Sequence, residues 1–239
     1  QFAAELEQLA GNEDQMNKLA KEIEKKEKIV TKLAIELADM REIGAKALKQ
    51  GVEKELKELH MNGVRFGVDF NYPPDPQGFV QYHKEKLKPT SIGLGTLEFL
   101  FSPNPGEELR PLAKIASGGE LSRIMLALKS ILNKQDTIPV MIFDEVDTGI
   151  GGRIAEKVGT KLKKVAETKQ VFCITHLPQI AGMASTHYRV EKNVQGKRTR
   201  AGIRQLEFTE RVKELARMSS GEKITEASLQ HARELISGQ

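Results

Sequence analysis

The first sixty residues place apolar side chains at the spacing of a coiled coil. Alternate steps of four and three residues from Phe2 reach ten positions, of which all but the two glutamates are apolar: Leu6, Leu9, Glu13, Met16, Ala20, Ile23, Glu27, Val30, Ala34 and Leu37. This 3.5-residue period predicts a helix that pairs along one stripe with a second helix. The alternative is an ordinary amphipathic helix of a bundle. We expect a coiled-coil arm over residues 1–62, because Asn62 and Gly63 then predict a turn.

Beyond this turn the pattern becomes that of an α/β domain, which we expect over residues 63–239. Alternating apolar and polar positions predict strands at 64–70 and 96–101, and a proline-rich loop follows each of them. Further strands are expected at 187–192 and 197–206, and helices at about 119–133, 209–218 and 225–236.

Two apolar runs in the middle of this domain predict strands that are buried on both faces. The runs cover residues 138–143 and 170–175, and a helical segment at about 150–166 lies between them. Strand, helix and strand at this spacing predict a βαβ unit with parallel pairing. The expected fold class is therefore α/β with parallel core strands, preceded by a long helix.

The composition argues against a membrane protein and against a disulfide-rich one. The chain has 239 residues, 29% of them charged, and a formal net charge of +4. No apolar run reaches the roughly 18 residues of a membrane span, and the start lacks the apolar core of a signal peptide. The single Cys173 fits a reducing compartment, so we expect a cytoplasmic protein. Because Gln1 already lies in a helical pattern, we expect the sequence to be part of a longer chain.

Two adjacent acids, Asp144 and Glu145, follow the first apolar run. The carboxyl ends of parallel strands face the crevice where α/β sheets bind ligands. An Asp there can hold Mg²⁺, directly or through water, and a Glu after it can act as a general base toward a water molecule. The alternative is that Asp144 caps the next helix and Glu145 is solvated.

The segment SGGELS at 117–122 begins the predicted helix that precedes these acids. Ser117 and Glu120 have the spacing of a capping box, which is the structural interpretation. Gly118 and Gly119 add what a cap does not need, since backbone N–H groups without side chains can approach an anion closely at a helix start. The segment therefore also predicts contact with a phosphate group.

His176 follows the second apolar run. If the two strands pair in parallel, this histidine approaches the same crevice as Asp144 and Glu145. A lone histidine is more often structural, but one beside an acid pair is a candidate for contacting a phosphate or its attacking water.

Taken in this order, the segments resemble an ABC-type ATPase head. ASGGELSR, IFDEVDTGIGG and ITHLPQIA are similar to its signature motif, its Walker B strand with the D-loop, and its switch-histidine segment. Longer stretches, including PLAKIASGGELSRIMLALK and the tail ERVKELARMSSGEKITEASLQHARELI, resemble the bacterial double-strand-break repair branch of the SMC-like ATPases. The resemblance covers about residues 60–239. It implies the C-terminal lobe of a head that is assembled from both ends of a longer chain.

The resemblance also implies a role for each candidate residue and names the ligands, ATP and Mg²⁺. Asp144 would assist Mg²⁺ through water, Glu145 would be the catalytic base, and His176 would be the catalytic switch that senses the γ-phosphate. The implied nucleotide-binding residues, which meet ATP held by the opposite head of a homodimer, are Ser117, Gly118, Gly119, Glu120 and Asp147.

The sequence departs from the family in what it lacks. It contains no GxxxxGK[ST] phosphate loop and no Q-loop, which the family carries in the N-terminal half of the protein. One implied partner is therefore that N-terminal half with its outgoing arm. The resemblance also implies a second head and DNA as partners, and a location in the cytoplasm at the nucleoid. The isolated chain is expected to be inactive.

Two other functions stay open at this point. The same motifs occur in nucleotide-binding subunits of transporters, against which the heptad arm argues. A non-catalytic coiled-coil module is the other alternative, and the intact acids and signature glycines argue against it. Basic segments at 84–88 and 192–200 permit contact with DNA but do not demand it.

Overall fold

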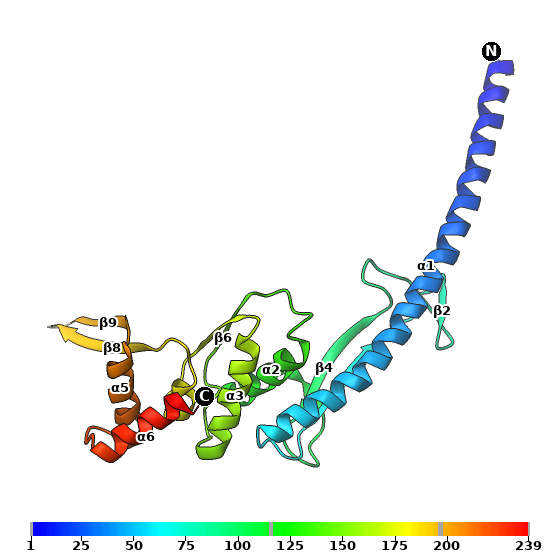
Figure 1. Ribbon diagram of the computed structural model, residues 1–239. Coiled ribbons are helices and arrows are strands. Elements are labelled where there is room, and N and C mark those ends of the chain that lie inside the picture. The colour runs from blue at the N-terminus through cyan, green and yellow to red at the C-terminus, as the bar shows by residue number, and fades with distance from the viewer. Residues whose placement is uncertain (1, 115–116, 196–197, 239) are drawn as a thin grey trace. The chain divides into compact units, whose positions relative to one another are not determined.

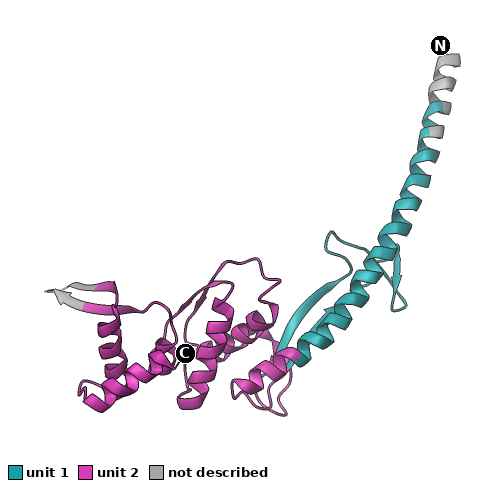
Figure 2. Ribbon diagram, viewed as in Figure 1, with its two compact units in different colours: residues 1–50, 66–100 teal, residues 51–65, 101–239 magenta. Residues whose placement is uncertain are grey.

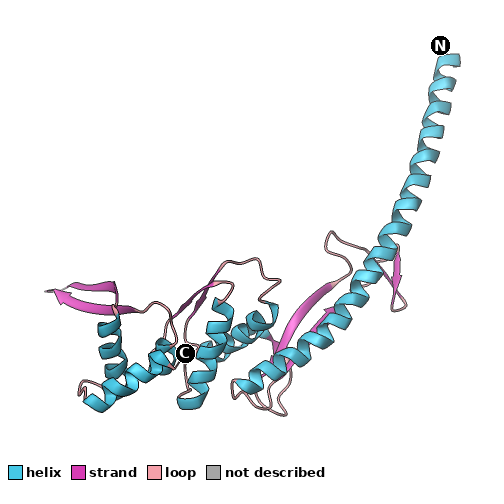
Figure 3. Ribbon diagram, in the orientation of Figure 1, coloured by secondary structure: helices cyan, strands magenta, loops and turns pink. Residues whose placement is uncertain are grey.

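The computed structural model describes residues 2–114, 117–195 and 198–238. Figure 1 and Figure 3 show a long N-terminal helix followed by short strands and helices. The chain divides into two compact units (Figure 2), one formed by residues 1–50 with 66–100 and the other by residues 51–65 with 101–239. The division expected near residue 62 stays a prediction.

Helix α1, Phe2–Glu58, confirms that the N-terminal segment is helical, and its residues up to Gln50 belong to the first unit. Strands β1, Arg65–Asn71, and β4, Thr96–Ser102, confirm the two predicted strands. They belong to a sheet of order β1-β4-β5 in which β5 is the short strand Arg110–Pro111.

A hairpin that the sequence analysis did not predict packs on α1. Strands β2, Val80–Tyr82, and β3, Glu85–Leu87, pair in antiparallel fashion. Their apolar side chains bury Ala34 and Ala38 of the helix. Tyr82 donates hydrogen bonds to Asp39 (3.0 Å) and to Glu42 (3.3 Å). Burial and the hydrogen bond to Asp39 raise the pKa of Tyr82, so this phenol stays a donor at neutral pH.

This hairpin changes the predicted coiled-coil stripe. Ala34, which the stripe includes, is 6% exposed because the hairpin covers it. Most of the large apolar side chains that α1 leaves exposed follow a line shifted toward Leu19 and Leu33, whereas Ile29 and Ile43 are exposed outside it. This line, which we call the arm seam, consists of Met16, Leu19, Ile23, Val30, Leu33, Leu37 and Met40. Its steps of three, four and seven residues keep the heptad period.

The second unit contains the predicted βαβ motif. Strand β6, Val140–Phe143, pairs in parallel with β7, Gln170–Cys173, and helix α3, Gly152–Ala166, connects them. Helix α2, Gly118–Leu132, precedes β6. These elements confirm the predicted helices and the parallel strand pair.

The prediction that both faces of this strand pair are buried is wrong for this chain. One face is packed: Met141 and Phe143 join the core with apolar residues of α3, among them Val158 and Leu162. The other face stays exposed, with Val140 at 41%, Ile142 at 70%, Phe172 at 43% and Ile174 at 60%. We call these four residues the open sheet face.

The remaining elements lie after β7 in the sequence. Strands β8, Tyr188–Gln195, and β9, Arg198–Gln205, form an antiparallel hairpin, and helices α5, Phe208–Ser220, and α6, Glu226–Ser237, follow, all as predicted. The turn η1, Leu112–Lys114, and helix α4, Pro178–Gly182, were not predicted. Within the described residues no helix is long and apolar enough to cross a membrane.

Candidate functional site

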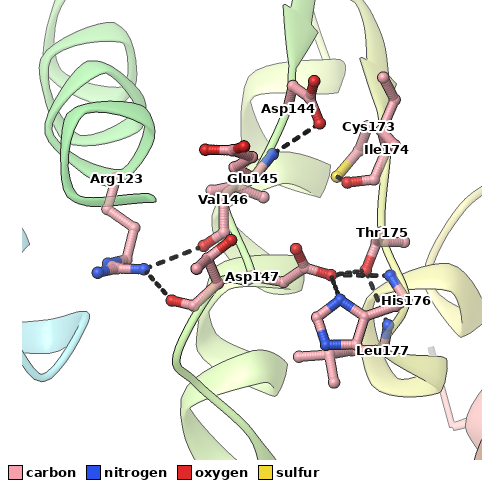
Figure 4. Close-up of polar contacts among 11 residues, drawn as sticks. Arg123, Asp144, Glu145, Val146, Asp147, Cys173, Ile174, Thr175, His176 and Leu177 are labelled. Carbon is pink, nitrogen blue, oxygen red and sulfur yellow. Dashed lines mark hydrogen bonds and ion pairs between the residues drawn. The ribbon is translucent and has the colours of Figure 1, made fainter. Parts of the chain in front are cut away.

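The acid pair lies where β6 ends, on the turn that leads to α3 (Figure 4). Both side chains are exposed, and the Asp144 carboxylate accepts a hydrogen bond from the Glu145 backbone N–H at 2.9 Å. Glu145 has a left-handed backbone with φ of +57°. For a residue with a Cβ atom this conformation costs about 1–2 kcal/mol, so the turn is held in place by its surroundings.

The start of α2 lies against this turn. Ser117 caps the helix, its hydroxyl oxygen accepting the N–H of Glu120 at 3.4 Å, as the sequence predicted. A Cβ atom built on Gly118 would lie 1.9 Å from Oε2 of Glu145. One built on Gly119 would lie 2.9 Å from the Cβ of Thr148. The two glycines therefore let the helix start approach the turn more closely than any other residue would.

Two side chains of α2 hold the backbone of the same turn. Ser122 donates from its hydroxyl to the carbonyl oxygen of Asp144 at 2.5 Å. Arg123 donates to the carbonyl oxygens of Thr148 at 2.9 Å and Val146 at 3.5 Å. Arg123 is only 8% exposed, and burial lowers its pKa. These hydrogen bonds join α2 directly to the turn after β6.

Arg123 was not among the residues predicted from the sequence. It lies four residues after the buried Gly119 and three before the buried Leu126, on the packed face of α2. A charged residue at that helical spacing, within an apolar stripe, could have indicated a buried arginine with specific partners. Buried charges are rare unless they are paired.

Asp147 links the turn to the segment after β7. The residue is 3% exposed, and its Oδ2 atom accepts the Thr175 hydroxyl at 2.5 Å and the His176 backbone N–H at 2.9 Å. The Nδ1 atom of His176 lies 3.0 Å from the same oxygen, as Figure 4 shows. The histidine side chain is itself 70% exposed. The two strand ends thus come together, although no hydrogen bond joins His176 to Asp144 or Glu145 in the described residues.

Cys173 lies beside these acids but is chemically quiet. Burial raises the pKa of its thiol to about 12, and the nearby carboxylates of Asp147 and Asp144 add to this effect. Because the thiolate is the nucleophile and the metal ligand, the raised pKa of Cys173 disfavours both roles at neutral pH.

The acid pair fits a magnesium ion that takes some of its ligands from the protein and the others from the phosphates of a nucleotide. Among the described residues no group of three or more His, Cys, Asp or Glu side chains could hold a metal by itself. Mg²⁺ usually keeps several waters and binds proteins through one or two carboxylates plus the phosphates of its substrate. The exposed Asp144 can supply one such carboxylate.

Comparison with known proteins shows extensive similarity to curated bacterial proteins. The chain is 38% identical over 234 residues to the DNA repair protein RecN of Bacillus subtilis, covering 97% of this chain and 41% of that protein. It is 43% identical over 205 residues to RecN of Rickettsia prowazekii, covering 86% and 35%. RecN of Streptomyces coelicolor is 40% identical over 204 residues, covering 85% and 36%. The chain thus spans well under half the length of these relatives.

Comparison with solved structures gives weaker likenesses. A structure from work on SMC ATPases covers 78% of this chain and 98% of its own, with 17% identity and a TM-score of 0.42. An Smc head domain with coiled coil and joint from Pyrococcus yayanosii covers 76% and 30%, with 18% identity and a TM-score of 0.48. We draw nothing from these two, because both TM-scores are low. No protein-family model matches the chain.

Proposed function

The chain corresponds to the C-terminal part of the RecN proteins of bacterial DNA repair, and on this premise we propose that it is one lobe of a composite ATPase head. In this proposal residues 1–62 are the returning coiled-coil arm and residues 63–239 are the C-terminal lobe. The phosphate loop, which the sequence lacks, is carried by the N-terminal part of the same protein.

The open sheet face is the observation that carries this proposal. It exposes four large apolar side chains on a parallel strand pair whose other face packs against the core. Parallel sheets are normally covered on both faces. A second layer supplied by the N-terminal part would bury these residues and would bring its phosphate loop beside Asp144 and Glu145.

Each residue at the turn then has a defined task. Asp144 would hold Mg²⁺ through water, Glu145 would accept a proton from the attacking water, and His176 would contact the γ-phosphate. Mg²⁺ supplies neutralisation of the charge that develops on the phosphate oxygens. The start of α2, from Ser117 through Gly118 and Gly119 to Glu120, offers backbone N–H groups to the ATP of a second head.

The arm seam indicates the second helical partner. Seven large apolar residues at heptad spacing are exposed along α1. A helix in water buries such a line against another helix. We assign this partner to the outgoing arm of the same protein.

DNA is the substrate class that the RecN relatives suggest. The basic segment at 84–88 is described and exposes Lys84, Lys86 and Lys88. The segment at 192–200 lies partly outside the described residues. A role in double-strand-break repair at the nucleoid, with ATP closing a homodimer of heads, completes the proposal.

The test is to separate the two parts and to recombine them. This chain alone should hydrolyse no ATP, whereas co-expression with the N-terminal part should give a complex that does. In that complex Glu145→Gln should bind ATP and accumulate dimers without turnover, because the base is lost while the binding groups stay. Glu156→Gln, on the exposed surface of α3, is the matched control and should turn over normally. Robust hydrolysis by this chain alone would contradict the composite head.

A further inference from the structure

The contacts of Asp147 are concentrated on one oxygen atom. Two donors, the hydroxyl of Thr175 and the backbone N–H of His176, converge on Oδ2, and the Nδ1 atom of the His176 ring lies 3.0 Å from the same oxygen. A carboxylate on a side chain that is 4% exposed needs such partners, because an unpaired buried charge is strongly unfavourable. All three come from the segment that follows β7 within the same chain.

The backbone around Asp147 is fixed as well. Arg123 donates to the carbonyl oxygens of Val146 and Thr148, the residues on either side of it. Thr175, which donates to the carboxylate, also accepts the backbone N–H of Leu177 at 3.0 Å. The carboxylate and the histidine therefore meet in an arrangement that is held from α2 on one side and from the start of α4 on the other.

The His176 ring has a buried carboxylate beside one of its nitrogen atoms, while most of the ring is exposed to solvent. Its side chain is 70% exposed while Nδ1 lies 3.0 Å from a buried carboxylate. A hydrogen bond at one ring nitrogen decides which tautomer is present and how the other nitrogen is presented.

We propose that Asp147 is a positioning residue for His176 in the same head. It accepts the Nδ1–H of the ring, fixes that tautomer, and leaves Nε2 facing outward with a free lone pair. When a phosphate arrives at Nε2, the ring takes up one proton from solvent and donates Nε2–H to the phosphate oxygen. The Asp147 carboxylate then balances the positive charge of the imidazolium, as the buried acid of a catalytic triad does.

This proposal differs from the role that the family resemblance implies for Asp147. A D-loop acid at a dimer interface would face a second head, whereas this carboxylate is buried against its own switch segment. The catalytic part of the inference rests on the proposed ATPase function. The tautomer of His176 does not, since it can be measured in this chain without nucleotide.

The first experiment measures that tautomer. Long-range ¹H–¹⁵N correlation spectra of the ¹⁵N-histidine-labelled chain would be recorded near pH 9, well above the ordinary imidazole pKa of about 6.5. The chain has five histidines, and the His176 signals are identified by their loss in His176→Gln. We expect the Nδ1–H pattern at His176 in the unaltered chain. An Nε2–H pattern there would overturn the proposal without any variant being needed.

Three substitutions refine this result. Asp147→Ala should convert His176 to the Nε2–H tautomer that free histidine prefers. Asp147→Asn should keep the Nδ1–H tautomer, because the amide oxygen still accepts. Asp144→Ala removes a neighbouring acid that does not contact the ring, and it should change nothing in the histidine spectrum. An unchanged His176 pattern in a folded Asp147→Ala chain would contradict the proposal.

The second experiment uses the full-length protein. Asp147→Ala should lower kcat for ATP hydrolysis roughly tenfold or more with little change in KM, because orientation rather than binding is lost. A normal kcat would overturn the positioning role. If the unaltered full-length protein hydrolysed no ATP, the ATPase proposal would fail while the tautomer result would still decide the Asp147–His176 relationship.

Discussion

The carboxylate of Glu145 lies against the α-carbon of Gly118. A Cβ atom at Gly118 would come within 1.9 Å of Oε2 of Glu145, the end of a flexible side chain. At the next residue the situation differs, since a Cβ atom on Gly119 would lie 2.9 Å from the Cβ of Thr148 and 3.1 Å from the carbonyl oxygen of Glu145. The first contact can be relieved by rotation of one side chain, whereas the second involves atoms held by the backbone.

Alanine at these two glycines should therefore have unequal effects on stability. Gly119→Ala should lower the free energy of unfolding by about 1–3 kcal/mol, since the turn must shift to accept the methyl group. Gly118→Ala should change it by less than about 0.5 kcal/mol, because Glu145 swings away. Urea unfolding of the two variants measures the difference. Equal losses would mean that Glu145 is held rigidly at Gly118.

The left-handed backbone of Glu145 gives a second prediction. Alanine is ordinarily more stable than glycine by about 0.5–1 kcal/mol in regular structure. At position 145 the order should be reversed, because φ of +57° costs alanine about 1–2 kcal/mol and costs glycine almost nothing. Glu145→Gly should thus be at least as stable as Glu145→Ala in thermal or urea unfolding.

The control for this reversal is Glu156, an exposed residue within α3. There the alanine variant should be the more stable by about 1 kcal/mol, as helix propensity demands. If glycine were also less stable than alanine at position 145, the left-handed turn would not be present in solution.

The βαβ motif could be predicted because its signals are local. Two short apolar runs separated by a helical segment fix β6, α3 and β7, and they place Asp144 and His176 at strand ends. What covers each face of these strands is not local. The sequence of the apolar run through Ile142 would be the same whether this chain or another segment covered the strands. The expectation that both faces are buried within this chain was therefore wrong.

The side-chain contacts of the turn were also beyond sequence pattern. Nothing in the spacing of Asp147 and Thr175 indicates that a hydroxyl and a histidine ring share one carboxylate oxygen. The β2–β3 hairpin was missed because three-residue strands such as Val80–Tyr82 carry almost no periodic signal. It matters nonetheless, since it covers Ala34 and shifts the exposed stripe of α1.

The two faces of β6 provide a third prediction. Met141 is 7% exposed in the core, whereas its neighbour Ile142 is 70% exposed on the open sheet face. In this chain Met141→Ala should lower the free energy of unfolding by about 2–4 kcal/mol, and Ile142→Ala should change it by less than about 0.5 kcal/mol. When this chain is co-expressed with the separate N-terminal part, Ile142→Lys should disrupt their association, which co-purification measures. A large loss from Ile142→Ala in this chain alone would show that the face is already covered.

The environment of Glu214 predicts how the stability of the chain changes at low pH. It is 6% exposed on α5, and its carboxylate receives Arg217 at 2.6 Å and Arg189 at 3.2 Å. Burial by itself would raise the pKa of Glu214, but the hydrogen bond and charge of Arg217, with Arg189 and His187, outweigh it and lower the pKa below its ordinary value of 4.5. The carboxylate is therefore charged more readily in the folded chain than in the unfolded one.

A lowered pKa in the folded state means that this stabilisation is present above about pH 4.5 and is lost as the pH falls through the lower, folded-state value. Glu214→Gln should thus be less stable than the unaltered chain at pH 7, and the difference should shrink as the pH is lowered below 4.5. Urea unfolding at several pH values from 7 to 3 measures it, with the exposed Glu156→Gln as the control for loss of one carboxylate. A difference that stayed constant or grew in acid would show that burial, rather than the arginines, controls this group.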